Sequence, residues 1–268
     1  MNRSLIPLLS LLFASVLSSS AWAVEYYELE VYGYQTPAHH ELELENTTSM
    51  SSDETPALDN HILRSTFEFS YGWTDSFETT AYLDYTQPAD DAGEYTAFRG
   101  HARTRFFEKG ELPVDLGAYF EVELPRNYAQ KDVGFEFRPI LEKDLPHRFV
   151  FRLNPQVELS HVAVDPNTTV VTLDPDEAPT TAVMPSTPKQ WLTEWGVASS
   201  LAYNWNDRIQ PHVDWHYGFN DLSSLLIPSV DVNLKNGFKA TAGVGFGLSS
   251  TTEQRLIVAR LEYELYLF

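Results

Sequence analysis

The chain has 268 residues, no cysteine and a formal net charge of −20. The absence of cysteine excludes a disulfide framework and a thiolate metal site. The acidic excess argues against nucleic acid as a partner and against docking on anionic lipid through a basic patch. No stretch beyond the N-terminus is apolar enough for a spanning helix, so a membrane form of this chain would have to cross with strands.

Residues 1–23 have the organisation of a secretory signal peptide. Arg3 supplies the positive charge, residues 5–16 form a short apolar run, and the Ala-Trp-Ala sequence at 21–23 fits the small-x-small cleavage rule. Because this apolar run is short for a spanning helix, we expect cleavage before Val24 rather than an uncleaved anchor.

From about Leu63 to the last residue, Phe268, apolar and polar residues alternate nearly one for one. Phe67 and Phe69 share one parity, for example, and Glu68 falls on the other. Because successive side chains on a strand point to opposite faces, a period of two predicts β-strands. One face is aromatic and aliphatic and the other is highly charged, which is typical of a barrel with lipid outside and a polar lumen inside.

Twelve segments carry this alternation, and most approach the about 9–11 residues with which a tilted strand crosses a bilayer. The predicted strands are residues 41–47, 61–73, 77–86, 95–107, 114–124, 133–141, 148–159, 191–203, 209–219, 229–235, 238–248 and 256–267.

Every second connection between these segments is short, and Asn236-Gly237 is a strong signal for a two-residue hairpin. Most intervening connections are longer and polar, and we expect residues 160–190 to form an exposed external loop. The sequence therefore predicts an all-β fold: a single antiparallel transmembrane β-barrel of about 12 strands with short periplasmic turns and longer extracellular loops. The alternative is a soluble periplasmic sandwich or lipocalin-like barrel, in which the aromatic face would be the core.

The barrel is expected to span residues 41–268, with residues 24–40 in front of it. This leading segment could be a periplasmic tail, a plug in the lumen or an additional strand. We expect a tail or plug, because a thirteenth strand would make the number odd and separate the two chain ends. The predicted location is the cell outer membrane, with the N-terminus in the periplasm.

With lipid outside, parity assigns the charged face to the lumen. Arg99, Arg103 and Arg105 lie on a strand between two acid-bearing strands, so cross-strand ion pairs are expected. These charges could rigidify a nearly closed lumen or line a narrow charge-selective pore. The predicted lumen-lining residues are Arg64, Glu68, Glu78, Asp84, Arg99, His101, Arg103, Arg105, Asp115, Glu121, Glu123, Glu136, Arg138, Arg148, Arg152, Glu158, Glu194, His212, Asp214, His216, Arg260 and Glu262.

His212, Asp214 and His216 share one strand face, which suggests a metal site or a proton relay. Two histidines four residues apart on a strand lie about 13 Å apart, too far to share one ion. We therefore predict no metal and no cofactor. Ser160 and His161 are adjacent and point to opposite faces, and the chain has no His-x-Ser sequence of the kind outer-membrane phospholipases use, so no catalytic residue is predicted.

The chain ends in a strand closed by Phe268, which is similar to the signal that delivers bacterial outer-membrane barrels to their assembly machinery. In typical signals the terminal aromatic residue shares the parity of the lipid-facing side chains. Here Phe268 instead shares the parity of Glu262 and Glu264. Residues 71–84 and 106–113 resemble turn regions of small, largely uncharacterised Gram-negative outer-membrane barrels near the transporter-like family of meta-pathway phenol degradation. That resemblance extends over residues 41–268 and implies a barrel that passes small molecules; it identifies no chemistry.

The sequence thus predicts a narrow pore or transporter-like protein for the passive passage of small solutes. A structural or surface-binding barrel with a salt-bridged lumen is the alternative, and an outer-membrane enzyme is third. The expected partners are outer-membrane lipid and lipopolysaccharide, the barrel assembly machinery during biogenesis, and small solutes; no nucleic acid is expected.

Overall fold

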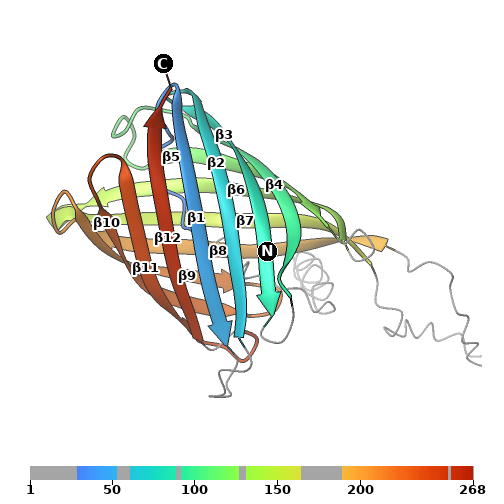
Figure 1. The fold of residues 1–268 in the computed structure, drawn as a ribbon. Helices are drawn as coiled ribbons and strands as arrows, with labels where there is room; N and C mark the ends of the chain where they lie inside the picture. The colour runs from blue at the N-terminus through green and yellow to red at the C-terminus, as the bar shows by residue number, and fades with distance from the viewer. Residues whose placement is uncertain are drawn as a thin grey trace, which may run out of the picture.

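The computed structural model describes residues 29–52, 61–88, 92–126, 131–163, 189–252 and 255–267. The predicted signal peptide, most of the predicted loop at 160–190, and Phe268 lie outside these residues. The described chain forms twelve strands that close into one barrel (Figure 1). Its one helix is a 3-10 turn at Pro146–Arg148, and no described helix is long and apolar enough to cross a membrane.

The strands follow the chain in order. They are β1 Glu41–Ser52, β2 His61–Thr74, β3 Phe77–Pro88, β4 Glu94–Arg105, β5 Asp115–Pro125, β6 Lys131–Leu145, β7 Phe149–Ala163, β8 Lys189–Tyr203, β9 Ile209–Gly218, β10 Ser224–Asn233, β11 Phe238–Gly247 and β12 Arg255–Tyr266.

Every strand pairs antiparallel with its neighbours in the chain, and β1 pairs with β12 to close the sheet. The closing register runs from Glu41 opposite Tyr266 to Ser52 opposite Arg255. Closure removes both free sheet edges, so every strand has a partner on each side. The predicted single antiparallel barrel of twelve strands is confirmed.

Several predicted strand boundaries were wrong by four or five residues, among them the end of β1, which continues to Ser52. The tenth strand begins at Ser224 rather than at Ser229, so that Pro228 lies inside it, opposite Val213 of β9. Pairing of β10 with β11 stops at Leu226 and resumes at Ser229. Proline has no N–H to donate, and it lies where the β10–β11 ladder is interrupted. The sequence pattern does not reveal this interruption.

The turn between β6 and β7 is shorter than predicted. Glu142 belongs to β6, and the turn consists of Pro146, His147 and Arg148. Arg148 was predicted on a strand facing the lumen; it is instead an exposed turn residue with a φ of 69°. The hairpin signal at Asn236-Gly237 is correct, since both residues have the positive φ that a tight β-hairpin requires, 61° and 78°.

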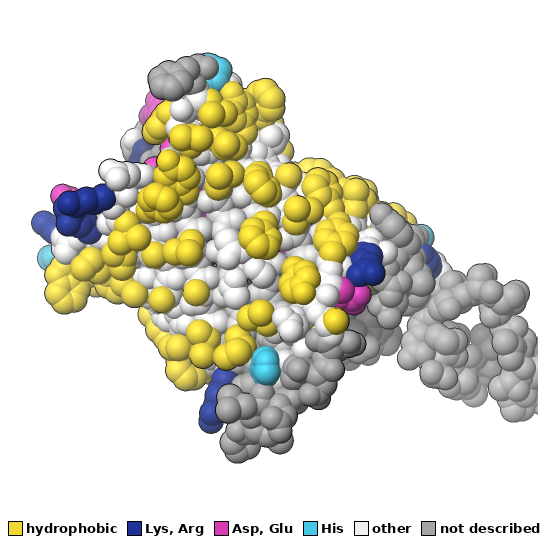
Figure 2. All heavy atoms as spheres, in the orientation of Figure 1, with side chains coloured by type: hydrophobic (Ala, Val, Ile, Leu, Met, Phe, Trp, Pro, Cys, Tyr) yellow, Lys and Arg dark blue, Asp and Glu magenta, His cyan; other side chains and the backbone are white. Residues whose placement is uncertain are grey.

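The distribution of side chains inverts that of a soluble protein. Apolar side chains on the strands are exposed on the outside, for example Phe67 at 47% and Phe69 at 48%, whereas Arg99 on the inside is 1% exposed. Figure 2 shows hydrophobic side chains spread over the strand surface, with charged groups near the rims of that face. A soluble barrel would bury the aromatic face, so this arrangement supports the membrane barrel over the lipocalin-like alternative.

Candidate functional site: a plugged and charged lumen

The chain that precedes β1 lies inside the barrel. We call residues 29–35 the plug segment. Its residues Leu29, Val31, Tyr32 and Tyr34 are only 1–4% exposed. The chain then leaves the lumen at the rim of short turns, where the Thr36 hydroxyl donates to the backbone oxygen of Asp75 at 3.1 Å. Residues 24–40 were expected to form a tail, a plug or an additional strand. The described part of this segment that precedes Thr36 lies in the lumen as a plug.

The inner end of the plug segment is apolar. Leu29 packs in one cluster with Leu225 and Ile227 of β10 and Leu256 and Val258 of β12. These four strand residues are 0–6% exposed and lie near the ends of β10 and β12 that face the longer connections. The plug segment therefore runs along the lumen from the long-loop side to the short-turn rim, and an apolar contact closes its far end.

Tyr32 anchors the middle of the plug segment to β3, β5 and β7. Its ring stacks on Tyr119 with centroids 4.7 Å apart, and its hydroxyl lies 3.0 Å from that of Tyr82. Its backbone oxygen accepts a hydrogen bond from Asn154 Nδ2 at 3.2 Å. Ile140 completes this buried cluster. Side-chain packing and backbone hydrogen bonding thus fix the same residue.

Tyr34 holds the outer end of the plug segment. Its backbone N–H donates to Glu142 Oε2 at 3.2 Å, and its hydroxyl donates to the backbone oxygen of Phe107. Burial raises the pKa of Tyr34 above its usual value, although the nearby Arg105 guanidinium opposes this. The hydroxyl therefore stays protonated and remains a donor at neutral pH.

The lumen face of β3 to β7, which we call the arginine wall, is a network of ion pairs. Arg99 Nε lies 2.7 Å from Asp84 Oδ2, and its Nη1 lies 3.3 Å from Glu121 Oε2. All three side chains are 1–3% exposed. The guanidinium of Arg99 also lies 4.5 Å from the centroid of the Tyr82 ring. A buried charge needs such compensation to be tolerated.

The other arginines of this wall are paired in the same way. Arg103 Nε lies 2.6 Å from Glu78 Oε1, and His101 Nε2 lies 3.3 Å from the same oxygen. Arg138 Nη2 donates to Glu136 Oε2 at 2.8 Å. The predicted cross-strand pairing is therefore present, together with pairs along one strand such as Arg138 and Glu136.

Most of the residues predicted to line the lumen lie on inward-facing strand positions; Arg148 lies in the turn before β7 and lines the two cavities nearer the rim. Arg105, Arg152, Arg260 and His212 are partly exposed to the interior, while Arg105 also pairs with Glu108 of the adjacent turn at 3.3 Å. The buried members are Arg64, Glu78, Asp84, Arg99, His101, Asp115, Glu121, Glu136, Arg138, Glu194, Asp214, His216 and Glu262. Glu68, Glu123 and Glu158 are half-buried.

Several charged lumen residues were missed by the sequence reasoning. Those on strands are Glu41, Glu43, Glu45, Glu142, Asp231, Lys239 and Glu264, and Glu30 lies in the plug segment. Leu42 and Leu44 occupy the opposite parity of β1, so the alternation that found the arginine wall was also available for the acids of β1.

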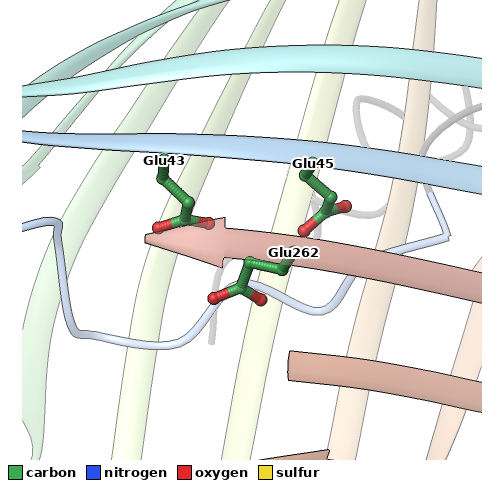
Figure 3. Close-up of side chains that lie close together, drawn as sticks. All are labelled: Glu43, Glu45 and Glu262. Atoms are coloured by element: carbon green, nitrogen blue, oxygen red, sulfur yellow. The ribbon is translucent and has the colours of Figure 1, made fainter. Parts of the chain in front are cut away.

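Within the predicted group of His212, Asp214 and His216, the carboxylate of Asp214 interacts with both histidines. His212 Nε2 lies 3.3 Å from Asp214 Oδ2, and its Nδ1 lies 3.8 Å from Asp231 Oδ2 on β10. Among the described residues, the acids close enough to share an ion are Glu43, Glu45 and Glu262. Figure 3 shows Glu43 and Glu45 on β1 and Glu262 on β12 converging in the lumen.

Three cavities lie between the plug segment and the short-turn rim. The inner one, of about 270 Å³, we call the lumen cavity; it is lined by the plug segment and by β1, β4, β7 and β9 to β12. Cavities of about 520 and 370 Å³ lie nearer the turns at Asn206 and Asp144. All three have Gln210 in their lining, so they are neighbours, and the plug segment lines the inner one.

Comparison with known proteins places the fold. No family model and no curated protein matches the chain. Among solved structures, an outer-membrane channel from Pseudomonas putida F1 aligns with a TM-score of 0.57 at 9% identity, covering 89% of this chain and all of the channel. The fold of this chain is therefore similar to that of an outer-membrane β-barrel.

Two further structures have the same architecture. The NanC porin aligns with a TM-score of 0.51 at 6% identity and covers 85% of this chain and 100% of its own. The translocator domain of the autotransporter NalP from Neisseria meningitidis aligns with a TM-score of 0.50 at 11% identity over 85% of this chain and 88% of its own. The predicted resemblance to outer-membrane barrels is confirmed for the fold, and at these identities it transfers no solute.

Proposed function

We propose that this chain is an outer-membrane channel for small solutes and that the plug segment holds it closed in the described conformation. The observation that carries the proposal is the group of neighbouring cavities between the short-turn rim and the plug segment, inside a shell whose outer surface is apolar. A barrel that served only as a scaffold would have no need of these cavities. The predicted signal peptide fits export, with the short turns in the periplasm.

The plug segment determines whether a solute can cross. Its middle part accepts a hydrogen bond from Asn154. Its outer part donates hydrogen bonds to Glu142 and to the backbone oxygen of Phe107. Its inner end is held by apolar packing of Leu29. A charge placed in this apolar cluster would be costly to bury. A charged substitution at Leu29 should therefore release the plug segment while leaving the barrel strands unchanged.

The test is solute flux through vesicles that contain the folded full-length protein. Leu29→Asp places a carboxylate among Leu225, Ile227, Leu256 and Val258, and we expect it to raise the flux of small solutes by about tenfold over the parent chain. The matched control is Leu222→Asp, which introduces the same charge at a leucine that is 62% exposed and should leave flux unchanged.

An independent readout shows whether the plug segment has moved. The chain contains no cysteine, so Val31→Cys provides a single thiol at a position that is 4% exposed. We expect this thiol to be protected from a water-soluble reagent in the parent background and to be labelled when Leu29→Asp is added. Labelling without any flux would contradict the channel.

That outcome would favour the alternative of a structural or surface-binding barrel. The arginine wall is the observation in favour of that alternative, because its buried ion pairs rigidify half of the lumen.

A further inference from the structure

The lumen cavity has an excess of negative charge. Seven carboxylates and four Lys or Arg side chains line it, together with His212. Glu41, Glu43, Glu262 and Glu264 form one side of it, contributed by the paired strands β1 and β12, and we call this side the acidic wall. Charges this close and partly shielded from water interact strongly, so the balance of partners decides which ions the cavity accepts.

The four cations of the cavity already have acidic partners. Arg103 pairs with Glu78 at 2.6 Å and Arg152 with Glu142 at 3.0 Å, and neither of these acids lines the cavity. The first two cations therefore neutralise acids that lie outside the cavity.

The remaining two cations are paired within or beside the cavity. Lys239 Nζ lies 2.8 Å from Glu262 Oε2. Arg260 lies 3.2 Å from both Glu30 Oε1 and Glu45 Oε1. Each cation is thus engaged by at least one acid, and none is left over to attract an anion.

Some of the carboxylates have no such partner. Within the part of the chain that the structure describes, the side chains of Glu43 and Glu264 make no ion pair and no hydrogen bond. Asp214 differs from these two: it is 7% exposed, and its Oδ2 lies 3.3 Å from His212 Nε2. Glu264 is exposed, whereas Glu43 is partly buried in the cavity wall, so the cost of leaving a carboxylate without a cation falls mainly on Glu43.

We propose that the lumen cavity binds a small organic cation carrying an ammonium group. This inference rests on the proposed channel function and names the class of solute it would take. A primary ammonium offers three donors and no acceptor, which matches a wall of carboxylate oxygens. A cavity of about 270 Å³ has room for a short linear amine.

A bare metal ion fits this wall less well. The acids close enough to share an ion are Glu43, Glu45 and Glu262, and two of them are already paired with Arg260 and Lys239. An ion placed there would compete with both ion pairs. Glu43 and Glu264 lie opposite each other on β1 and β12 and pair with neither Arg260 nor Lys239, so an ammonium group bound by them need not displace either cation.

The test is equilibrium binding to the folded full-length protein in detergent, measured by calorimetry. The probes are putrescine, a short linear diamine, and succinate, a dicarboxylate of the same chain length, with calcium chloride as a third titrant. We expect saturable binding of putrescine and none of succinate. The double variant Glu43→Gln and Glu264→Gln should weaken putrescine binding by about tenfold, because it removes two attractive charges.

The matched control removes two acids outside the cavity, Glu94→Gln and Glu108→Gln, which are 61% and 70% exposed. It should bind putrescine like the parent chain. Absent putrescine binding, equal binding of succinate, equal loss in both double variants, or binding of calcium alone would each overturn the proposal. Because this readout needs no flux, bound putrescine without flux would contradict only the channel, and flux without bound putrescine only the cation site.

Discussion

The lumen residues show what happens to charge when a barrel turns its polar face inward. Arg99 and Asp84 are each 1% exposed and lie 2.7 Å apart, so water cannot solvate either charge if its partner is removed. Glu121 and the Tyr82 ring provide the rest of the environment of the guanidinium. The net stabilisation from such a pair is small, whereas removing one partner leaves a buried charge uncompensated and is strongly destabilising.

Arg99→Met should therefore destabilise the barrel by about 3–5 kcal/mol, because Asp84 and Glu121 would remain buried without their cation. The measurement is the free energy of unfolding from urea titration of the protein in lipid vesicles. Arg126→Met is the matched control: its partner is Glu94, both side chains are more than half exposed, and the expected cost is about 0–1 kcal/mol. Equal costs for the two variants would contradict this account of the arginine wall.

A lumen residue could be found from parity only where the predicted strand covered it, and even then the acids of β1 were missed. Arg99 and Arg138 followed from parity because both lie well inside their strands. Glu142 was missed because the predicted sixth strand ended at residue 141, and Arg148 was misplaced because the predicted seventh strand began there rather than at Phe149. Parity gives the direction of a side chain only while the strand continues.

At the scale of elements, the strands tolerate proline where the ladder is interrupted. Pairing of β6 with β7 stops at Phe137 opposite Val157 and resumes at Leu141 opposite Leu153. Pro139 of β6 lies within this interruption. Since proline has no N–H to donate, such interruptions explain why prolines inside β6 and β10 do not end the strands.

The chain enters β1 through a close backbone contact with β2. His40 N–H donates to the backbone oxygen of Gly72 at 2.9 Å, and a Cβ added to Gly72 would lie 2.0 Å from the backbone oxygen of Ala38. No side chain fits there, because the neighbouring atom is backbone rather than the end of a flexible side chain. Gly72 thus fixes the point where the chain passes from the lumen into the sheet.

We expect Gly72→Ala to displace the chain at Ala38 and to lower the free energy of unfolding by about 1–3 kcal/mol. The matched control is Gly100→Ala on β4, where the added Cβ would make an ordinary contact of 3.6 Å with the backbone oxygen of Thr80. That control should be neutral or slightly stabilising. Urea titration compares the two variants, and an unchanged midpoint for Gly72→Ala would show that the contact is not tight.

The plug segment could not have been predicted from local pattern. Residues 24–35 alternate much as the barrel strands do, so their sequence alone is compatible with a thirteenth strand. What keeps them out of the sheet is the pairing of β1 with β12, which joins residues more than two hundred positions apart. The alternation of neighbouring residues predicts that a segment is extended. The position of this segment in the lumen depends instead on closure of the whole barrel.

At the scale of the whole molecule, the outer surface distinguishes a membrane barrel from a soluble one. Phe137 lies mid-way along β6 and is 45% exposed, and Phe106 lies just beyond β4 at the short-turn rim and is 56% exposed. In water both would be ordinary exposed aromatics of equal consequence. In a bilayer their depths differ, and the cost of a charge depends on depth.

Phe137→Arg should therefore cost about 2–4 kcal/mol of unfolding free energy in vesicles, and Phe106→Arg about 0–1 kcal/mol, because only the first places the guanidinium near the middle of the hydrocarbon. Urea titration of both variants in the same vesicles gives the comparison. If Phe137→Arg were as well tolerated as Phe106→Arg, the aromatic surface would face water, and the barrel would belong to the soluble alternative. Because neither side chain faces the lumen, this measurement tests the membrane boundary independently of the plug segment and of any solute.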